Sequence, residues 1–259
     1  MKYVLKEGKI SKLEGGDSGQ TYLVNHNKKK FVLREYENEK AADYYVMVHK
    51  KLQQYGFFPN LYYKEKNKIL FEYIDGRDCK KSDALKVAYQ VGKICATINK
   101  LKLRSVDKDS KNVNYALELF RKNNFLNEED IRALEVRYET MRNKLKPKLT
   151  VEFDDVYAEN FRLRKGKVYL VDIEDIDYKY QGRGIGKAFL RWFKTKKQRQ
   201  KFKQGYESIA SMKFVTEDYL QFLYLNFLTF SLAYKVKNRK NINPKDKIRL
   251  IKIINGEKI

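Results

Sequence analysis

Three polar residues in the middle of the chain constrain its fold more than any other feature. Asp155 and Asn160 share the segment Val151–Asn160, and Asp172 ends the apolar run Val168–Val171 after a short polar turn. Since Asp and Asn are also common turn residues, the spacing alone is weak evidence. Its chemistry is specific, however: one carboxylate can take a proton from an alcohol, while an amide and a second carboxylate hold Mg²⁺. The pattern predicts phosphoryl transfer.

A glycine-rich turn near the start of the chain is the second element of such a site. Gly15, Gly16, Ser18 and Gly19 precede an apolar strand that ends at Val24. Glycine lets backbone N–H groups approach phosphate oxygens, because no Cβ intrudes. These four residues are therefore predicted to bind the phosphates of ATP.

The strand after this turn carries a cation, and an acidic helix follows it. Arg34 ends the strand, where it can grip a phosphate with two donors, although an arginine on an exposed strand would look the same. A helix is predicted from about residue 37 to 54, and it should carry the acid that orients Arg34. Glu39 is the first choice and Asp43 the alternative, which the sequence does not decide.

Two further strands end in a glycine turn at Gly76. The second of them holds Glu72 and runs on to Ile74, and this segment is predicted to join two parts of the molecule. Between it and Asp155, Leu85, Val91 and Ile98 recur at helical spacing. Further helices are predicted at 114–123 and 128–146.

Taken in this order, the residues from Gly15 to Asp175 resemble the aminoglycoside phosphotransferase branch of the protein-kinase-like superfamily. The resemblance implies an α+β, two-lobed fold, with a small antiparallel β-sheet N-lobe (1–73) and a mainly helical C-lobe (74–259) that holds a helical insert at about 104–150. It also implies that Asp155 is the catalytic base, that Asn160 and Asp172 hold magnesium, and that ATP is the donor.

Further roles follow from the same resemblance. Arg34 and Glu39 would act on the phosphates of ATP, and adenine would pair with the backbone at about Glu72 to Ile74. Phe153-Asp154 and Ile173-Glu174 depart from the sequences of protein kinases at these points, which argues against a regulated protein kinase.

The charge of the chain is strongly positive. It has 56 Lys and Arg against 33 Asp and Glu, a formal net charge of +23 in 259 residues. Such an excess favours a polyanionic partner, and nucleic acid is the first candidate. Part of it forms a run after Asp172 in which Trp192, Phe193 and Phe202 are interleaved. The residues predicted to bind RNA are Arg183, Lys187, Arg191, Lys194, Lys196, Lys197 and Arg199. The alternative is a solvated helix face.

A kinase core with a cationic flank also resembles the archaeal RNA kinases, and this resemblance implies phosphorylation of an internal ribose 2'-hydroxyl of RNA, with tRNA as the expected RNA. Two rivals remain open. One is a small-molecule kinase for a sugar, aminoglycoside or choline-like acceptor, and the other is a catalytically inactive kinase-like module that only binds RNA. A small atypical protein kinase is a more distant third.

The remaining features bear on compartment. Cys79 and Cys95 stand far apart without nearby ligands, which predicts a reducing compartment and no structural zinc. The first residues lack the apolar core of a signal peptide, and the longest apolar run, 219–234, is short for a membrane span. The sequence predicts a cytoplasmic protein that does not bind membranes, and leaves its oligomeric state open.

Overall fold

A five-stranded antiparallel sheet forms one end of the molecule. The computed structural model describes residues 4, 7–13, 20–103 and 113–259, so Gly15, Gly16, Ser18 and Gly19 lie outside the described residues. The strand order is β1-β2-β3-β5-β4. The strands are β1 (Lys9–Lys12), β2 (Gln20–His26), β3 (Lys29–Glu35), β4 (Leu61–Glu65) and β5 (Lys68–Glu72).

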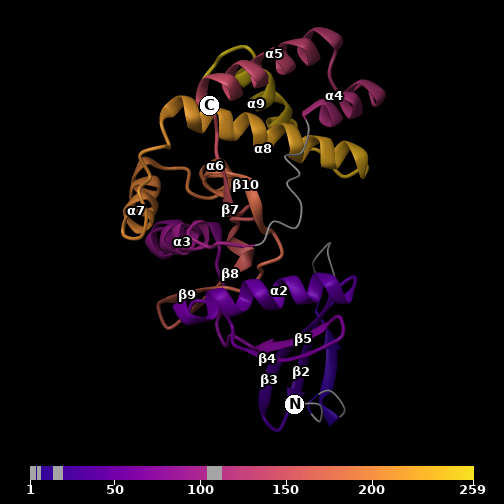
Figure 1. Ribbon diagram of the computed structural model, residues 1–259, viewed down its shortest axis with the longest axis vertical. Coiled ribbons are helices and arrows are strands. Elements are labelled where there is room, and N and C mark those ends of the chain that lie inside the picture. Colours follow the sequence, from indigo (N-terminus) through magenta and orange to yellow (C-terminus); the bar gives the residue numbers. More distant parts are fainter. Residues whose placement is uncertain (1–3, 5–6, 14–19, 104–112) are drawn as a thin grey trace.

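Local chemistry explains the elements at this end. The β2–β3 hairpin turns through Asn27 and Lys28, both with positive φ (48° and 61°), and the twist of such a turn matches that of the flanking strands. Helix α2 (Glu39–Leu52) begins at Asn38, whose side chain accepts a hydrogen bond from the backbone N–H of Ala41. Figure 1 shows α2 lying between the sheet and the helical end of the molecule.

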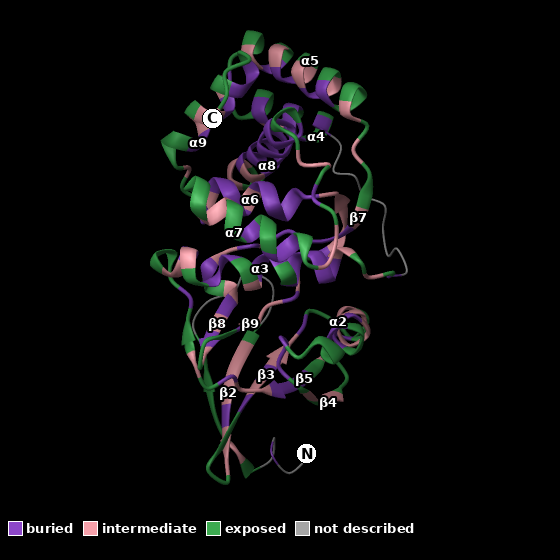
Figure 2. Ribbon diagram, turned by 90° about the vertical axis from the view of Figure 1, so that its left-hand side faces the viewer, coloured by how far each residue is buried: buried purple, intermediate pink, exposed green. Residues whose placement is uncertain are grey.

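The helical end is built around one buried helix, α8 (Glu217–Lys237), which begins at the cap residue Thr216. Figure 2 shows α8 almost entirely buried, whereas α5 is exposed along its outer side. The other helices are α3 (Ala84–Asn99), α4 (Val113–Lys122), α5 (Glu128–Leu145), α6 (Arg183–Arg191), α7 (Lys196–Glu207) and α9 (Pro244–Ile254).

Two small sheets lie between these ends and carry the polar residues of interest. Strand β7 (Leu149–Phe153) pairs with β10 (Ile176–Tyr180). The second sheet has the order β6-β8-β9. Its strands are β6 (Arg77–Asp78), β8 (Phe161–Arg164) and β9 (Lys167–Leu170). The loops after β7 and β9 therefore emerge between the large sheet and the helices.

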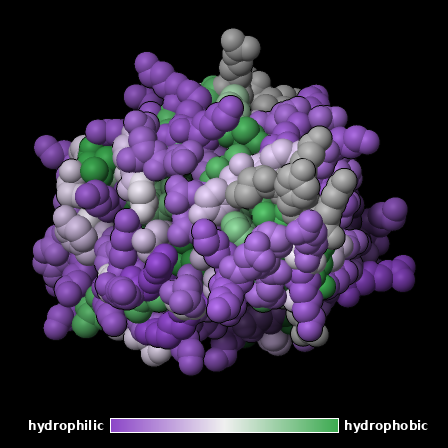
Figure 3. All heavy atoms as spheres, turned by 90° about the horizontal axis from the view of Figure 1, so that it is seen from below, coloured by the Kyte–Doolittle hydropathy of each residue, from purple (hydrophilic) through white to green (hydrophobic). Residues whose placement is uncertain are grey.

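The predicted α+β architecture, an antiparallel sheet followed by a helical part, is confirmed. None of the helices in the described part of the chain is both long and apolar enough to cross a membrane. Figure 3, which views the molecule from the end that carries the large sheet, shows a mainly hydrophilic surface with hydrophobic residues in small separate patches.

Candidate active site

A cavity of about 1000 Å³ lies between the large sheet and the helical end. Its walls come from β3, from the segment Glu72–Ile74, from the loops after β7 and β9, and from α6 and α8. Asp155, Asn160 and Asp172 all line it. Residues far apart in sequence thus converge on one space, with the sheet on one side and helices on the other.

Asp155 and Asn160 are held together by the loop after β7. The Asn160 side-chain nitrogen donates to the Asp155 backbone oxygen (2.8 Å) and to its Oδ2 (2.6 Å). The Val171 N–H donates to the Asn160 carbonyl (3.0 Å), which ties this loop to the segment that follows β9. Since the amide nitrogen is committed to Asp155, the amide oxygen is the atom that Asn160 can offer to a metal.

Asp172 is fixed from two sides. Its Oδ1 accepts from the Glu174 backbone N–H (3.1 Å), and its Oδ2 accepts from the Arg34 guanidinium (3.0 Å). Arg34 Nε lies 2.7 Å from Glu174 Oε1. Burial disfavours the charge on Arg34, yet Asp172 and Glu174 raise its pKa overall. The arginine therefore stays charged between two carboxylates, and all three residues line the cavity.

The prediction that Glu39 or Asp43 orients Arg34 is wrong in this structure. Both acids lie on the outer side of α2 and pair with Lys64 at 3.0 and 2.7 Å. Helix α2 instead turns Tyr45 toward the site, and its hydroxyl donates to the Glu174 carbonyl (2.9 Å). Sequence reasoning missed Glu174, although an acid two residues after the metal-ligand candidate is a visible signal.

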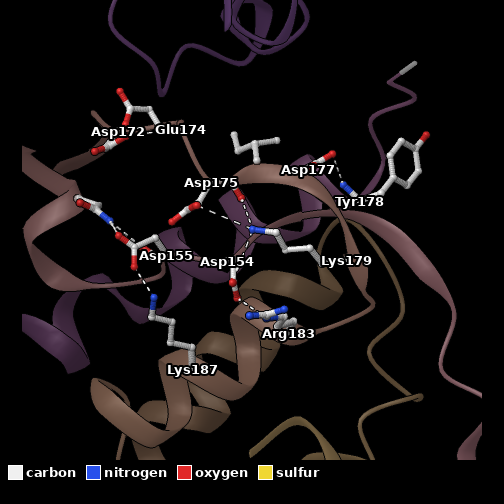
Figure 4. Close-up of polar contacts among 12 residues, drawn as sticks. Asp154, Asp155, Asp172, Glu174, Asp175, Asp177, Tyr178, Lys179, Arg183 and Lys187 are labelled. Atoms are coloured by element: carbon white, nitrogen blue, oxygen red, sulfur yellow. Dashed lines mark hydrogen bonds and ion pairs between the residues drawn. The ribbon is translucent and has the colours of Figure 1, made fainter. Parts of the chain in front are cut away.

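A second charged cluster surrounds Asp155 (Figure 4). Arg183 Nε lies 3.0 Å from Asp154 Oδ1, and Lys179 Nζ lies 3.6 Å from Asp154 Oδ2. Lys187, one turn beyond Arg183 on α6, bonds Asp155 Oδ1. Burial disfavours the charge on Lys187, but Asp154 and Asp155 raise its pKa overall. These cations hold the loop after β7 in place.

The basic run does not form one exposed surface. Arg183 and Lys187 face the acids described above, and Arg191 pairs with the buried Asp246 of α9. Arg199 donates to the carbonyls of Phe193 and Phe189 near the end of α6. These four residues are part of the internal framework, because acids and carbonyls face them from neighbouring elements.

Only the short stretch between α6 and the first turn of α7 matches the prediction of exposed cations, since Lys194, Lys196 and Lys197 are exposed. The interleaved aromatic residues are in the core: Trp192, Phe193 and Phe202 are at most 3% exposed. They cannot stack on unpaired bases.

The sheet side of the cavity contains both residues predicted to contact adenine. Glu72 and Ile74 line it, together with the apolar Val32 and Leu170. The Glu72 carboxylate accepts from the Asn60 backbone N–H (3.2 Å) and side chain (2.7 Å), so this acid holds the segment in shape. The apolar side chains of Val32 and Leu170, from two different sheets, are a further pair that sequence reasoning missed.

Comparison with solved structures shows the fold class. The choline kinase LicA from Streptococcus pneumoniae matches with a TM-score of 0.71 and 17% identity, over 97% of this chain and 94% of that one. An ethanolamine kinase from Plasmodium vivax matches at 0.70 and 12%, over 98% and 84%. An aminoglycoside phosphotransferase with ADP bound matches at 0.64 and 13%, over 95% and 91%.

The fold is the kinase-like fold that these choline, ethanolamine and aminoglycoside kinases share. No family model matches the sequence, and no curated protein matches it. The expected likeness to the aminoglycoside phosphotransferase superfamily is thus supported by structure, whereas the finer likeness to an archaeal RNA kinase is not.

The predicted RNA kinase activity is wrong. The structural neighbours are small-molecule kinases, which agree with the alternative of a small-molecule acceptor. The structure also weakens the prediction of an RNA-binding surface, because Arg183, Lys187 and Arg191 form internal ion pairs.

Proposed function

We propose that the protein is an ATP- and magnesium-dependent kinase that phosphorylates a hydroxyl of a small molecule. The observation that carries this proposal is the convergence of Asp155, Asn160 and Asp172 on one cavity. The structural neighbours support it, since several were solved with ADP, AMP or ATP bound.

The residues present fit magnesium and a nucleotide. Carboxylate and amide oxygens are the ligands that Mg²⁺ prefers, and phosphates supply the rest of its coordination. Asp172 and the Asn160 amide oxygen would hold the metal, which neutralises charge on the phosphates when bound. Val32, Leu170 and Ile74 would enclose the base, and Arg34 holds a positive charge next to Asp172.

The protein's own residues then perform the transfer. Asp155 accepts the proton of the acceptor hydroxyl, whose oxygen forms the new bond to the γ-phosphorus as the bond to ADP breaks. Asn160 fixes the Asp155 carboxylate through its side-chain nitrogen, and Lys187 holds the other oxygen. Positioning and charge neutralisation supply most of the rate.

The test is transfer of label from γ-³²P-ATP to choline, ethanolamine, an aminoglycoside and hexoses. Asp155→Asn should lower transfer at least about 100-fold, because it removes the base, while binding of ADP with magnesium survives. Asp172→Asn should weaken nucleotide binding only when magnesium is present. Glu129→Gln, on the exposed side of α5, is the matched control.

Slow hydrolysis of ATP by water provides a readout that needs no acceptor. Wild-type protein that neither binds ADP with magnesium nor hydrolyses ATP would refute the proposal. So would an Asp155→Asn variant that transfers phosphate as fast as the wild type.

A further inference from the structure

The acceptor side of the cavity is cationic. The term acceptor side means the part of the cavity formed by Asp154, Asp155, Asp175, Lys179 of β10, and the residues of α6 and α8 that line the cavity. All three acids are already engaged: Asp154 with Lys179 and Arg183, Asp155 with Lys187, and Asp175 with Lys179 at 3.9 Å. A cationic acceptor would have to displace one of the protein's own cations to reach an acid.

The aromatic faces on this side are also occupied. The Lys187 ammonium lies 4.4 Å from the ring centre of Tyr157 and 5.5 Å from that of Phe227. The Arg183 guanidinium lies 5.7 Å from the Phe230 ring centre. Ring faces of this kind bind ammonium ligands, but here internal cations already lie over them. The two means of binding an ammonium group, an open acid and an open ring, are both used internally.

One half-buried lysine on this side, Lys235, pairs with no acid among the residues that the structure describes. Phe227, Ser231 and Lys235 recur every fourth residue on α8, so they share the stripe that faces the cavity. Lys235 has no ion pair with any acid in the described part of the chain, and its distance from Phe227 along the helix is about 12 Å. Lys235 thus supplies a positive charge on the wall of the cavity that Asp155 also lines, about two helical turns from Phe227.

We propose that the acceptor is an anionic alcohol, whose phosphate or carboxylate group binds Lys235 while its hydroxyl faces Asp155. This inference rests on the proposed kinase function and narrows its substrate class. It separates the protein from its structural neighbours, which are named as choline, ethanolamine and aminoglycoside kinases. An anion at Lys235 gains a charge-assisted contact, whereas an ammonium group there meets repulsion.

Four sugars of one ring size test the charge preference. Glucose 6-phosphate, glucuronate, glucose and glucosamine are titrated calorimetrically into full-length protein saturated with ADP and magnesium. The proposal expects at least one anionic sugar to bind about tenfold more tightly than glucose, with glucosamine weakest. The phosphate and the carboxylate sugars distinguish the two possible anionic groups. Transfer of label from ATP should follow the same order.

Variants on α8 assign the effect. Lys235→Gln should abolish the advantage of the anionic sugar over glucose, and Lys235→Glu should reverse it. Lys237→Gln should leave the advantage intact, because Lys237 is exposed and lies over the Tyr115 ring, away from the cavity lining. A fold effect is excluded by equal Tm values for the two Gln variants.

Two outcomes would overturn the inference. One is that glucose or glucosamine binds as tightly as the anionic sugars. Failure of all four sugars to bind counts as the same outcome, because no preference for an anion would then exist. The other is an equal response of Lys235→Gln and Lys237→Gln. Asp155-dependent transfer to choline or glucosamine would leave the kinase proposal standing while refuting the anionic acceptor, so the two failures are distinguishable.

Discussion

Glu152 is a buried acid on β7, just before the loop that carries Asp155. It is 2% exposed on β7, and its Oε1 accepts from the Asn99 side chain (2.7 Å) and the Gly182 backbone N–H (2.8 Å). Burial raises its pKa to about 8, although hydrogen bonds from Gly182 and Thr150 act in the opposite direction. At neutral pH the native protein therefore holds a proton on Glu152 that the unfolded chain releases.

This proton makes stability depend on pH. The native pKa of about 8 lies above the unfolded value, so the stabilisation is complete at low pH and is lost as pH rises. Relative to Glu152→Gln, the free energy of unfolding of the wild type should fall by up to about 1.4 kcal/mol per pH unit between pH 5 and 8. Urea unfolding of both proteins at pH 5, 6, 7 and 8 measures the difference, and parallel curves would contradict the assignment.

A second comparison at the residue scale separates Glu174, which lies next to Arg34 in the structure, from Glu39, which the sequence analysis chose as its partner. Glu174→Gln removes the carboxylate next to Arg34 Nε, whereas Glu39→Gln changes an exposed side chain bonded to Lys64. The first should raise the KM for ATP about tenfold, because Arg34 loses a charged partner that positions it. The second should change KM less than about twofold. A larger effect of Glu39→Gln in steady-state kinetics would restore the sequence-based assignment.

At the scale of elements, the sequence predicted what local patterns encode. Asp155, Asn160 and Asp172 could be found because short loops fix their spacing. The partner of Arg34 was sought on α2, but it is Glu174 of the loop after β9, and which face of α2 meets this loop is not encoded locally. That Tyr45 rather than Glu39 contacts this loop follows from packing between segments distant in the sequence.

The partners of the basic run also depend on packing between distant segments, although the spacing of its residues gave a signal in the sequence. Arg183, Lys187 and Arg191 are four residues apart, so they lie along one face of α6. A stripe of cations on a helix whose other residues are mostly buried indicates internal acids as partners. The stripe meets Asp154 and Asp155 of the loop after β7 and Asp246 of α9, which are distant from each other in the chain.

The contact between α3 and α7 gives a prediction at this scale. Gly205 packs so closely that an added Cβ would lie 1.8 Å from the Tyr89 carbonyl oxygen of α3. Gly205→Ala must push the helices apart, and we expect a loss of about 1–3 kcal/mol in the free energy of unfolding. Gln204→Ala, exposed on the same helix, should cost less than about 0.5 kcal/mol. Equal unfolding midpoints in urea for the two variants would contradict close packing.

For the whole molecule, net charge proved a poor guide to the site. A formal charge of +23 describes the chain, whereas chemistry depends on which cations remain unpaired inside one cavity. Most of the lysines and arginines named in the basic run either pair internally or lie on exposed turns. The charge signal becomes informative at Lys235, a cation on the cavity wall that pairs with no acid among the described residues.

The cavity is lined by residues of both the large sheet and the helical end. A nucleotide bound there would contact both parts and should stabilise the entire molecule. ADP with magnesium at about 100 times its Kd adds about 2.7 kcal/mol, which corresponds to a rise in Tm of roughly 5–10 °C for a chain of this size. Differential scanning calorimetry measures it. Chelation of magnesium or the Asp172→Asn substitution should remove most of the rise, whereas Glu39→Gln should keep it. A rise of equal size in the presence of a chelator would show that Asp172 and Asn160 hold no metal.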